Sequence, residues 1–439
     1  MTKRVYVETY GCQMNVADSE LILGQLDREG YTPTEDPDKA DVMLVNTCAV
    51  RDNAEQRVIG RMGELKRHKR PGVVLGVVGC MAQRLGLALL DDAQYVDLVV
   101  GPDGYRGLHD LIVAAQSGER VADVEFKSWE HYEDVPQRRP GKQVSAFVTV
   151  QRGCDYRCTF CIVPMTRGRE RSRTLVDVVT EVEGLSGDGV TEVTLLGQTV
   201  NSYHHGAHDF ADLLRSVGEV PGIRRVRFTS PYPNDFTDRV VEAMAEVETV
   251  CEHVHLPVQS GSSKVLKRMG RRYGREEYLS CVERLREAIP EIAITTDIIV
   301  GFPGESEDDF LETMSLVQEV AFEDAFTFKY SAREGTGALR LPDHIPDDVA
   351  GGRLERLIAV VRNGARRTNL GMVGSTHEVL VEKIARRGGR LQTRTRTNKV
   401  VLVDGPPEWI GTYRDIRLVG TTGATFTGVP SARGLAVVG

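Results

Sequence analysis

Short apolar runs alternate with amphipathic segments along the first 127 residues of the chain. The runs RVYVETYG, ADVMLVNTC and GVVLGVVGC have the composition of buried strands, and the segments SELILGQLDREG and NAEQRVIGRMGELKRHK have the spacing of helices. Strands and helices that alternate at about 35 residues form βαβ units around a parallel sheet. The pattern therefore predicts an open parallel α/β domain over residues 1–127.

The alternation resumes after a stretch without periodicity. Residues 128–142 mix charge, Pro and Gly, which is typical of a linker. About six strand-and-helix repeats then follow, from VSAFVTVQRG to EDAFTFKYSARE, and a long helix over about 347–369 closes the series. Six repeats are more than half of a TIM barrel, so residues 143–372 are expected to form a partial, TIM-like (βα)6 barrel.

Short strands and glycine turns indicate that residues 373–439 form a small β-barrel. Its beginning is basic, because nine Lys or Arg residues stand against two Glu between Arg366 and Lys399. Such a run is either a solvated face or a nucleic-acid-binding surface, and a basic β-barrel fused to an enzyme favours nucleic acid. The candidate phosphate contacts are Arg386, Arg387 and Arg390.

Composition narrows the class of protein. A chain of 439 residues that is 41% hydrophobic and 27% charged has room for two or three soluble domains. The N-terminus has no apolar signal and no segment is long and apolar enough to span a membrane, which predicts a cytoplasmic protein. The net charge of −8 argues against a uniformly basic nucleic-acid binder but allows a local basic patch.

Eight cysteines are too few for a disulfide scaffold, and three of them have a specific spacing. Cys154, Cys158 and Cys161 follow the pattern C-x3-C-x2-C, which places three thiolates around one [4Fe-4S] cluster and leaves one iron open. This spacing resembles the signature of radical S-adenosylmethionine enzymes. A structural zinc site is the alternative, but it usually has four ligands and no fourth Cys or His follows closely.

A second group of cysteines comes from the first domain. Cys12, Cys48 and Cys80 each follow one of the three clearest strands. Since ligands of open parallel sheets collect at the carboxyl ends of the strands, these residues are expected to form a second three-cysteine site. Three unrelated buried thiols are the alternative. Cys251 and Cys281 have no cluster spacing and are predicted to be structural thiols.

Seven segments together resemble the methylthiotransferase family. They are TYGCQMNVADSE, VNTCAVRDNAEQRV, VVGCMAQR, RGCDYRCTFCIVPMTRGRERSR, LLGQTVNSY, HLPVQSGSSKVLKRMGRRY and TDIIVGFPGESEDDF. The resemblance covers nearly the whole chain and includes a C-terminal basic domain of the TRAM type. It fits the tRNA-modifying branch of the family better than the branch that modifies a ribosomal protein.

The resemblance implies methylthiolation of C2 of N6-(dimethylallyl)adenosine at position 37, beside the anticodon. It implies two [4Fe-4S] clusters and S-adenosyl-L-methionine as cofactors, because a radical is needed to remove hydrogen from an unactivated carbon. It assigns radical formation to the Cys154 triad and the transferred sulfur to the Cys12 triad. The expected partners are the tRNA anticodon arm and an electron donor such as flavodoxin or ferredoxin, and the protein is expected to be a monomer without membrane contact.

Two other functions compete with this one. The first keeps the chemistry but uses threonylcarbamoyl-adenosine in tRNA, or an aspartate of a ribosomal protein, as the substrate. The second is a non-catalytic iron-sulfur sensor that binds RNA.

Polar residues at the predicted strand ends are candidates for holding S-adenosylmethionine. The candidates are Gln198, Asn201, Gln259, Ser260 and Gly301. The amides and the hydroxyl are alternatively turn residues that cap the following helices. Four arginines close to the cysteine loop are candidates for pairing with cofactor carboxylate or tRNA phosphate, or are simply exposed. They are Arg167, Arg169, Arg171 and Arg173.

Overall fold

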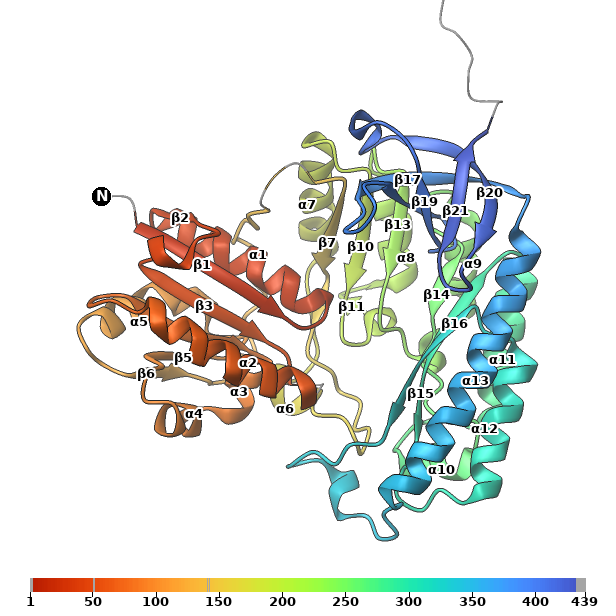
Figure 1. The fold of residues 1–439 in the computed structure, drawn as a ribbon, viewed down its shortest axis with the longest axis horizontal. Coiled ribbons are helices and arrows are strands. Elements are labelled where there is room, and N and C mark those ends of the chain that lie inside the picture. Colours follow the sequence, from red (N-terminus) through yellow and green to blue (C-terminus); the bar gives the residue numbers. More distant parts are fainter. Residues whose placement is uncertain (1–2, 50–51, 140, 142, 432–439) are drawn as a thin grey trace, which may run out of the picture.

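The computed structural model describes residues 3–49, 52–139, 141 and 143–431. Three bodies follow one another along the chain: an N-terminal sheet with its helices, a central open barrel, and a small C-terminal barrel (Figure 1). Among the described residues, no helix is both long enough and apolar enough to cross a bilayer.

The N-terminal sheet is parallel throughout, as predicted. Its strands lie in the order β2 (Tyr31–Pro33), β1 (Lys3–Tyr10), β3 (Val42–Thr47), β4 (Val74–Gly79), β5 (Leu98–Val100) and β6 (Val121–Asp123). Every residue of β3 and β4 is buried, because helices cover both faces of the sheet. One face packs on α1 (Gln13–Arg28) and α5 (Leu108–Gln116), and the other on α2 (Asp52–Leu65), α3 (Cys80–Leu85) and α4 (Leu87–Asp92).

The central body is the predicted partial (βα)6 barrel. Two three-stranded parallel sheets are joined by a parallel bridge between Val226 and Val250. The strands are β7 (Ser145–Thr149), β10 (Glu192–Leu196), β13 (Arg225–Phe228), β14 (His253–His255), β15 (Ala293–Val300) and β16 (Asp324–Lys329). Within the described chain, no ladder joins β7 to β16, so the barrel is open along that side.

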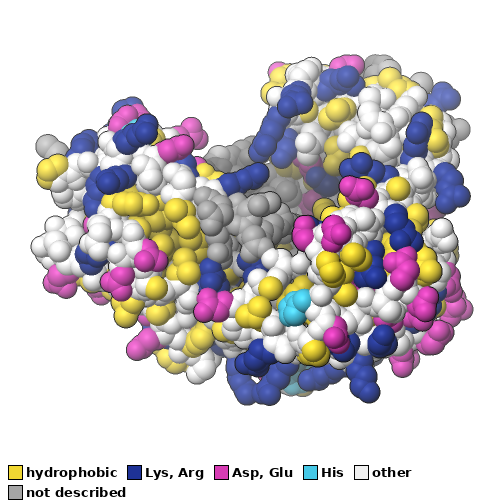
Figure 2. Space-filling model, turned by 60° about the horizontal axis from the view of Figure 1, so that its bottom comes forward, with side chains coloured by type: hydrophobic (Ala, Val, Ile, Leu, Met, Phe, Trp, Pro, Cys, Tyr) yellow, Lys and Arg dark blue, Asp and Glu magenta, His cyan; other side chains and the backbone are white. Residues whose placement is uncertain are grey.

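Helices cover the outside of this barrel. They are α7 (Leu175–Gly187), α8 (Phe210–Gly218), α9 (Asp238–Glu246), α10 (Ser263–Arg268), α11 (Arg275–Ala288) and α12 (Glu307–Val320). Long helix α13 (Asp347–Met372) packs on β16 and α12, which confirms the predicted closing helix. The molecule is hollowed between the N-terminal lobe and the other two bodies (Figure 2).

The C-terminal body is a closed five-stranded barrel, as predicted for a TRAM-type domain. Its strands are β17 (Thr376–Ile384), β18 (Leu391–Thr395), β19 (Val400–Val403), β20 (Tyr413–Thr421) and β21 (Phe426–Pro430). The core is small and apolar, with Val379, Val401, Ile416 and Phe426 at its centre.

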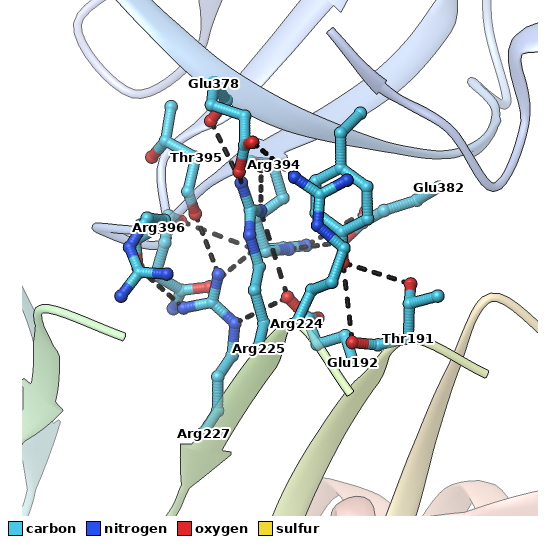
Figure 3. Close-up of polar contacts among 12 residues, drawn as sticks. Thr191, Glu192, Arg224, Arg225, Arg227, Glu378, Glu382, Arg394, Thr395 and Arg396 are labelled. Atoms are coloured by element: carbon cyan, nitrogen blue, oxygen red, sulfur yellow. Dashed lines mark hydrogen bonds and ion pairs between the residues drawn. The ribbon is translucent and has the colours of Figure 1, made fainter. Parts of the chain in front are cut away.

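This small barrel docks on the amino ends of the central strands. Arg225 and Arg227, from the start of β13, donate hydrogen bonds of 2.8 Å to the carbonyl oxygens of Arg394 and Arg396 (Figure 3). Tyr413 lies under the guanidinium of Arg224 at 3.7 Å from the ring centroid. The C-terminal barrel therefore closes the mouth opposite to the carboxyl ends of the strands, where barrel sites are built.

Candidate functional site

Sheet order brings Cys12, Cys48 and Cys80 to one edge. β1, β3 and β4 are adjacent, and Thr47 of β3 pairs with Tyr10 on one side and Gly79 on the other. The cysteines come directly after these strands: Cys12 is the N-cap of α1, Cys48 follows β3, and Cys80 begins α3. Three thiols from three neighbouring strands thus lie at the carboxyl end of the sheet.

Two buried asparagines fix the loops that present these thiols. Asn15 donates from Nδ2 to Asn46 Oδ1 at 3.1 Å and to the carbonyl oxygen of Thr47 at 3.2 Å. Asn46 donates in return to the carbonyl oxygen of Asn15 at 2.8 Å. The Cys12 thiol donates to Asn15 Oδ1 at 3.4 Å. This closed network joins the first two strand ends and satisfies polar groups that are fully buried.

Charge around this edge favours thiolates. A hydrogen bond from Cys48 lowers the pKa of the Cys12 thiol to about 6, and the positive charge of Arg167 acts in the same direction. Burial raises the pKa of Cys80, although Arg167 opposes that effect and donates from Nε to the Cys80 sulfur at 3.0 Å. A bound metal deprotonates a coordinating thiol outright, so a guanidinium beside a buried sulfur suits a metal-thiolate site.

The other cysteine triad lies in a loop framed by the hairpin β8 (Gln151–Arg152) and β9 (Arg171–Ser172). Gly153 begins the loop with a φ of 77°, and a Cβ there would lie 1.9 Å from the carbonyl oxygen of Arg169. The backbone N–H of Thr159 donates to the carbonyl oxygen of Met269 at 2.8 Å. The loop is therefore fastened both to its own hairpin and to the turn after α10.

The three thiols of this loop have different neighbours. Cys154 Sγ lies 3.2 Å from the hydroxyl of Thr199, and Arg271 donates to the sulfur of Cys158 at 3.4 Å. Burial raises the pKa of Cys154, and it raises the pKa of Cys161 to about 12. Buried thiols of this kind need a metal or a cation to ionise, and Arg271 supplies the cation.

Within the described part of the chain, no group of three His, Cys, Asp or Glu side chains lies close enough together to hold one metal ion.

The first cysteine triad contacts the segment that follows the second one. Cys80 packs in one apolar cluster with Ala49 and with Ile162, the residue after Cys161, and α3 contacts α6 (Val163–Arg167). The N-terminal domain and the barrel thus meet at the two cysteine sites.

Buried ion pairs hold this junction. Asp18 of α1 is fully buried and pairs with Arg152 at 3.1 Å and with Arg167 at 2.7 Å. Asp103 accepts two hydrogen bonds from Arg171, at 2.8 and 2.9 Å. Sequence patterns did not single out these two aspartates, because nothing local distinguishes a carboxylate whose partner is more than 60 residues away.

The prediction that the arginines after the cysteines pair with cofactor or phosphate, or are exposed, is wrong for three of the four. Arg167, Arg171 and Arg173 are buried and pair with protein carboxylates, Arg173 with Glu181 at 2.6 Å. They are neither exposed nor free for phosphate. Arg169 alone of the four is exposed.

The candidate S-adenosylmethionine contacts lie at the carboxyl ends of the strands but differ in availability. Gln198 follows β10, and its buried Oε1 has no hydrogen-bond partner. Asn201 uses both ends of its amide on the backbone of Tyr232, at 2.7 and 2.9 Å. The hydroxyl of Ser260 accepts from the backbone N–H of Ser262 at 3.2 Å. Ser260 thus makes a local turn contact, as the turn interpretation predicts, whereas Asn201 caps no helix and fixes the separate loop at Tyr232.

The last two candidates, Gln259 and Gly301, have backbones in the left-handed region of φ. Gln259 has a φ of 71° and forms a parallel bridge with Ile298 of β15. Gly301 has a φ of 73°, and a Cβ there would lie 2.6 Å from the Cβ of Ala350 on α13. Both residues therefore keep the strand ends close to neighbouring elements.

The basic run of the C-terminal barrel divides into two sets. Arg396 pairs with Glu252 at 2.7 Å, Lys399 pairs with Glu323 at 2.6 Å, and Arg394 pairs with Glu382, so these three cations act inside the protein. The hairpin between β17 and β18 holds the rest of the candidates: Arg386 and Arg387 are exposed and Arg390 is partly buried. Cys251 and Cys281 are both buried, as predicted for structural thiols.

Three family profiles match the chain in order. Residues 4–101 match "Uncharacterized protein family UPF0004", residues 148–317 match the Radical SAM superfamily, and residues 371–427 match the TRAM domain. Among solved structures, the radical S-adenosylmethionine methyltransferase TsrM from Kitasatospora setae has a TM-score of 0.56 and 17% identity, covering 77% of each chain. The cobalamin-dependent radical enzyme OxsB has a TM-score of 0.52 and 11% identity, covering 83% of this chain and 57% of that one. These two likenesses show the fold.

Curated relatives are much more similar in sequence. The tRNA-2-methylthio-N(6)-dimethylallyladenosine synthase of Porphyromonas gingivalis is 44% identical over 438 residues, which is 97% of this chain and 94% of that protein. The enzyme of the same name from Geotalea uraniireducens is 46% identical over 424 residues, which is 95% of this chain and 96% of that protein. At this identity and coverage, the chain belongs to the family of tRNA-2-methylthio-N(6)-dimethylallyladenosine synthases.

Proposed function

We propose that this protein methylthiolates C2 of N6-(dimethylallyl)adenosine at position 37 of tRNA. The observation that supports this most directly is the packing of Cys80, from the first triad, on Ile162, the residue after Cys161 of the second triad. A reaction that removes hydrogen from a carbon and puts sulfur in its place needs a radical source and a sulfur source at the same atom. Two neighbouring sites of three thiols meet that requirement.

Two [4Fe-4S] clusters and S-adenosylmethionine are the proposed cofactors. Cys12, Cys48 and Cys80 would hold one cluster, and Cys154, Cys158 and Cys161 the other. When bound, they supply radical hydrogen abstraction, sulfur and the methyl group. The guanidiniums of Arg167 and Arg271 lie against a sulfur of each triad, which fits thiolate ligands.

The proposed contacts of S-adenosylmethionine are Gln198, Asn201, Gln259, Ser260 and Gly301. Support differs among them. The Oε1 of Gln198 is a buried acceptor without a hydrogen-bond donor, and the amino group of S-adenosylmethionine would supply one. Asn201 and Ser260 would act by fixing the turns, and Gln259 and Gly301 by their backbone conformation.

The remaining parts of the proposal concern organisation and partners. The proposed domains are 1–127, 143–372 and 373–439, with a linker at 128–142. The anticodon arm would be bound partly by the exposed β17–β18 hairpin, since position 37 lies in a single-stranded loop whose base can be turned out. A flavodoxin or ferredoxin would supply electrons to a monomeric, cytoplasmic enzyme.

Nucleoside analysis of tRNA tests the function. A deletion strain should lack 2-methylthio-N6-(dimethylallyl)adenosine and accumulate N6-(dimethylallyl)adenosine. The wild-type gene should restore the product, the Cys12→Ala and Cys154→Ala genes should not, and Cys281→Ala should serve as the matched cysteine control. Persistence of the product in the deletion strain would exclude the proposal. Loss of a methylthiolated threonylcarbamoyl-adenosine instead would identify the alternative substrate.

A further inference from the structure

An aromatic pair lies exposed on the inner wall of the open barrel. Phe326 and Phe328 of β16 are 56% and 40% exposed. In the neighbouring strand β15, by contrast, every second residue is buried under the outer helices. Alternate residues of a strand point to opposite faces, so these two side chains share one face. Exposed apolar surface that lines a groove is a feature of ligand-binding sites.

Register shows that this face is the lumen. Phe326 pairs with Asp297 and Phe328 with Ile299, whereas Ile298 and Val300 belong to the core under the outer helices. The phenylalanines therefore point away from the helices, into the open interior. Figure 1 shows β14, β15 and β16 forming the wall of the barrel away from the N-terminal sheet.

A fixed polar pair adjoins the aromatic pair. His255 Nε2 lies 3.2 Å from Asp297 Oδ2, and His255 Nδ1 lies 3.0 Å from the hydroxyl of Thr295. The His255 ring meets the Phe326 ring edge-on, at 5.8 Å between centroids and 67° between planes. Both ring nitrogens are oriented by partners, and the His255 and Asp297 side chains keep 20% and 30% of their surface exposed to the lumen.

This wall continues into the proposed cofactor site. The backbone N–H of Gln259 donates to the carbonyl oxygen of Asp297 at 2.9 Å, and the N–H of Ile299 donates to the carbonyl oxygen of Gln259 at 2.8 Å. The Gln259 turn thus lies beside the strand positions that pair with Phe326 and Phe328. A ligand on the wall would lie next to S-adenosylmethionine.

We propose that Phe326 and Phe328 hold the dimethylallyl group of the substrate nucleoside, while the Asp297 carboxylate, held by His255, accepts a hydrogen bond from the N6–H of its adenine. This rests on the proposed function. A five-carbon apolar group needs apolar surface that excludes water, and a purine edge needs fixed donors and acceptors beside it.

Binding to paired RNAs tests the apolar half. Anticodon stem-loops that differ only in the dimethylallyl group would be titrated anaerobically into the oxidised holoenzyme, so that no turnover occurs. Wild type should prefer the prenylated RNA by about 10-fold to 100-fold. The Phe326→Ala/Phe328→Ala variant should bind both RNAs within about 3-fold of each other, and should bind the unmodified RNA as wild type does.

Two comparisons make this test specific. The Phe326→Leu/Phe328→Leu variant should keep most of the preference, because it keeps apolar surface. Val176→Ala, at a side chain 75% exposed on α7, is the matched control and should behave as wild type. A full preference in the alanine variant, or an equal weakening for both RNAs, would overturn the assignment. A turnover assay with a reductant separates this outcome from failure of the proposed function. If the proposed function is wrong, the wild-type enzyme will methylthiolate neither RNA.

Steady-state kinetics test the polar half. His255→Leu should raise the KM for prenylated tRNA about 10-fold, since it removes the ring that holds the Asp297 carboxylate in place. His255→Gln, which retains a donor and an acceptor, should recover most of that loss. The Val176→Ala control should have the KM of wild type and should form 5′-deoxyadenosine as wild type does. An unchanged KM in His255→Leu would remove His255 from the substrate site.

Discussion

Arg167 donates a hydrogen bond from Nε to the sulfur of Cys80 over 3.0 Å, and the two residues belong to different bodies of the protein. The same guanidinium pairs with Asp18 at 2.7 Å. One buried cation at the end of α6, the helix that follows the second triad, therefore contacts a thiol of the first triad and a carboxylate of α1. It fixes the distance between the two sites on which the proposed chemistry depends.

Replacing Arg167 should destabilise this junction. Arg167→Ala leaves Asp18 buried with one partner fewer, and breaking a buried pair in this way costs about 3–5 kcal/mol. Arg167→Lys keeps the charge but loses the planar fork that reaches two partners, so it should rescue only part of the loss. Anaerobic urea unfolding and iron content per chain are the measurements.

The control for Arg167 is two residues away. Arg169 is exposed, so Arg169→Ala should change unfolding by less than about 0.5 kcal/mol and leave the iron content unaltered. Equal effects of the two substitutions would contradict a specific role for the buried guanidinium.

The sequence predicted the three bodies and the position of both triads because these depend on local patterns. Strand-and-helix periodicity marks β1, β3 and β4, and a cysteine directly after each strand needs only sheet order to find its partners. The partners of Arg167 and Arg171 depend instead on how two domains dock. No spacing within the chain reports that Asp18 and Asp103 lie buried at the docking surface.

The C-terminal barrel shows the same limit. Its basic composition was visible in the sequence, but the division between internal and exposed cations was not. Arg396 and Lys399 meet Glu252 and Glu323 only because the small barrel covers the amino ends of the central strands. Charge counting treats all nine cations alike, whereas docking leaves Arg386 and Arg387 of the β17–β18 hairpin exposed.

Gly153 should be required for the cysteine loop. Its φ of 77° already disfavours other residues, and a Cβ would collide with the Arg169 carbonyl oxygen at 1.9 Å. Gly153→Ala should therefore cost more than about 3 kcal/mol and deplete iron. Gly206 has a similar φ of 62° with nothing within 4 Å of a Cβ, so Gly206→Ala should cost only about 1 kcal/mol. If both variants lose the same stability, the cost at Gly153 comes from its φ alone and not from the collision with the Arg169 carbonyl oxygen.

Removal of one triad should halve the iron. Reconstituted wild type should bind about eight iron and eight sulfide per chain, which is two four-iron clusters. The variant with Cys12, Cys48 and Cys80 all changed to Ala should bind about four and still form 5′-deoxyadenosine from S-adenosylmethionine. The variant with Cys154, Cys158 and Cys161 changed should also bind about four but form none. About four in wild type would exclude the two-cluster arrangement.

The β17–β18 hairpin should set the salt dependence of tRNA binding. Changing Arg386, Arg387 and Arg390 to Gln should raise the Kd and reduce the slope of log K against log salt by about 0.7–0.9 for each tRNA phosphate that the hairpin no longer neutralises. A charge-matched control replaces three exposed cations of the N-terminal domain, Arg4, Lys39 and Arg67, and should leave the slope unchanged. An unaltered slope in the hairpin variant would exclude this hairpin from phosphate binding.

Glu20 should make the interface between α1 and α7 sensitive to pH. Burial raises the pKa of Glu20 to about 7, although Arg139, 3.0 Å away, opposes the shift. The folded protein therefore binds more protons than the unfolded chain between the ordinary glutamate value of 4.5 and about 7. The contribution of protonated Glu20 to stability is complete below that window, and it is lost as the pH rises through about 7.

Glu20→Gln removes this proton and tests its effect. The free energy of unfolding of wild type, minus that of Glu20→Gln, should fall by about 2 kcal/mol between about pH 5.5 and pH 8.5. The difference between wild type and Glu35→Gln, a glutamate of the same domain, should stay flat over that range. A difference that rises with pH would mean that Arg139 outweighs burial and holds Glu20 ionised, because the ion pair would then be the stabilising form.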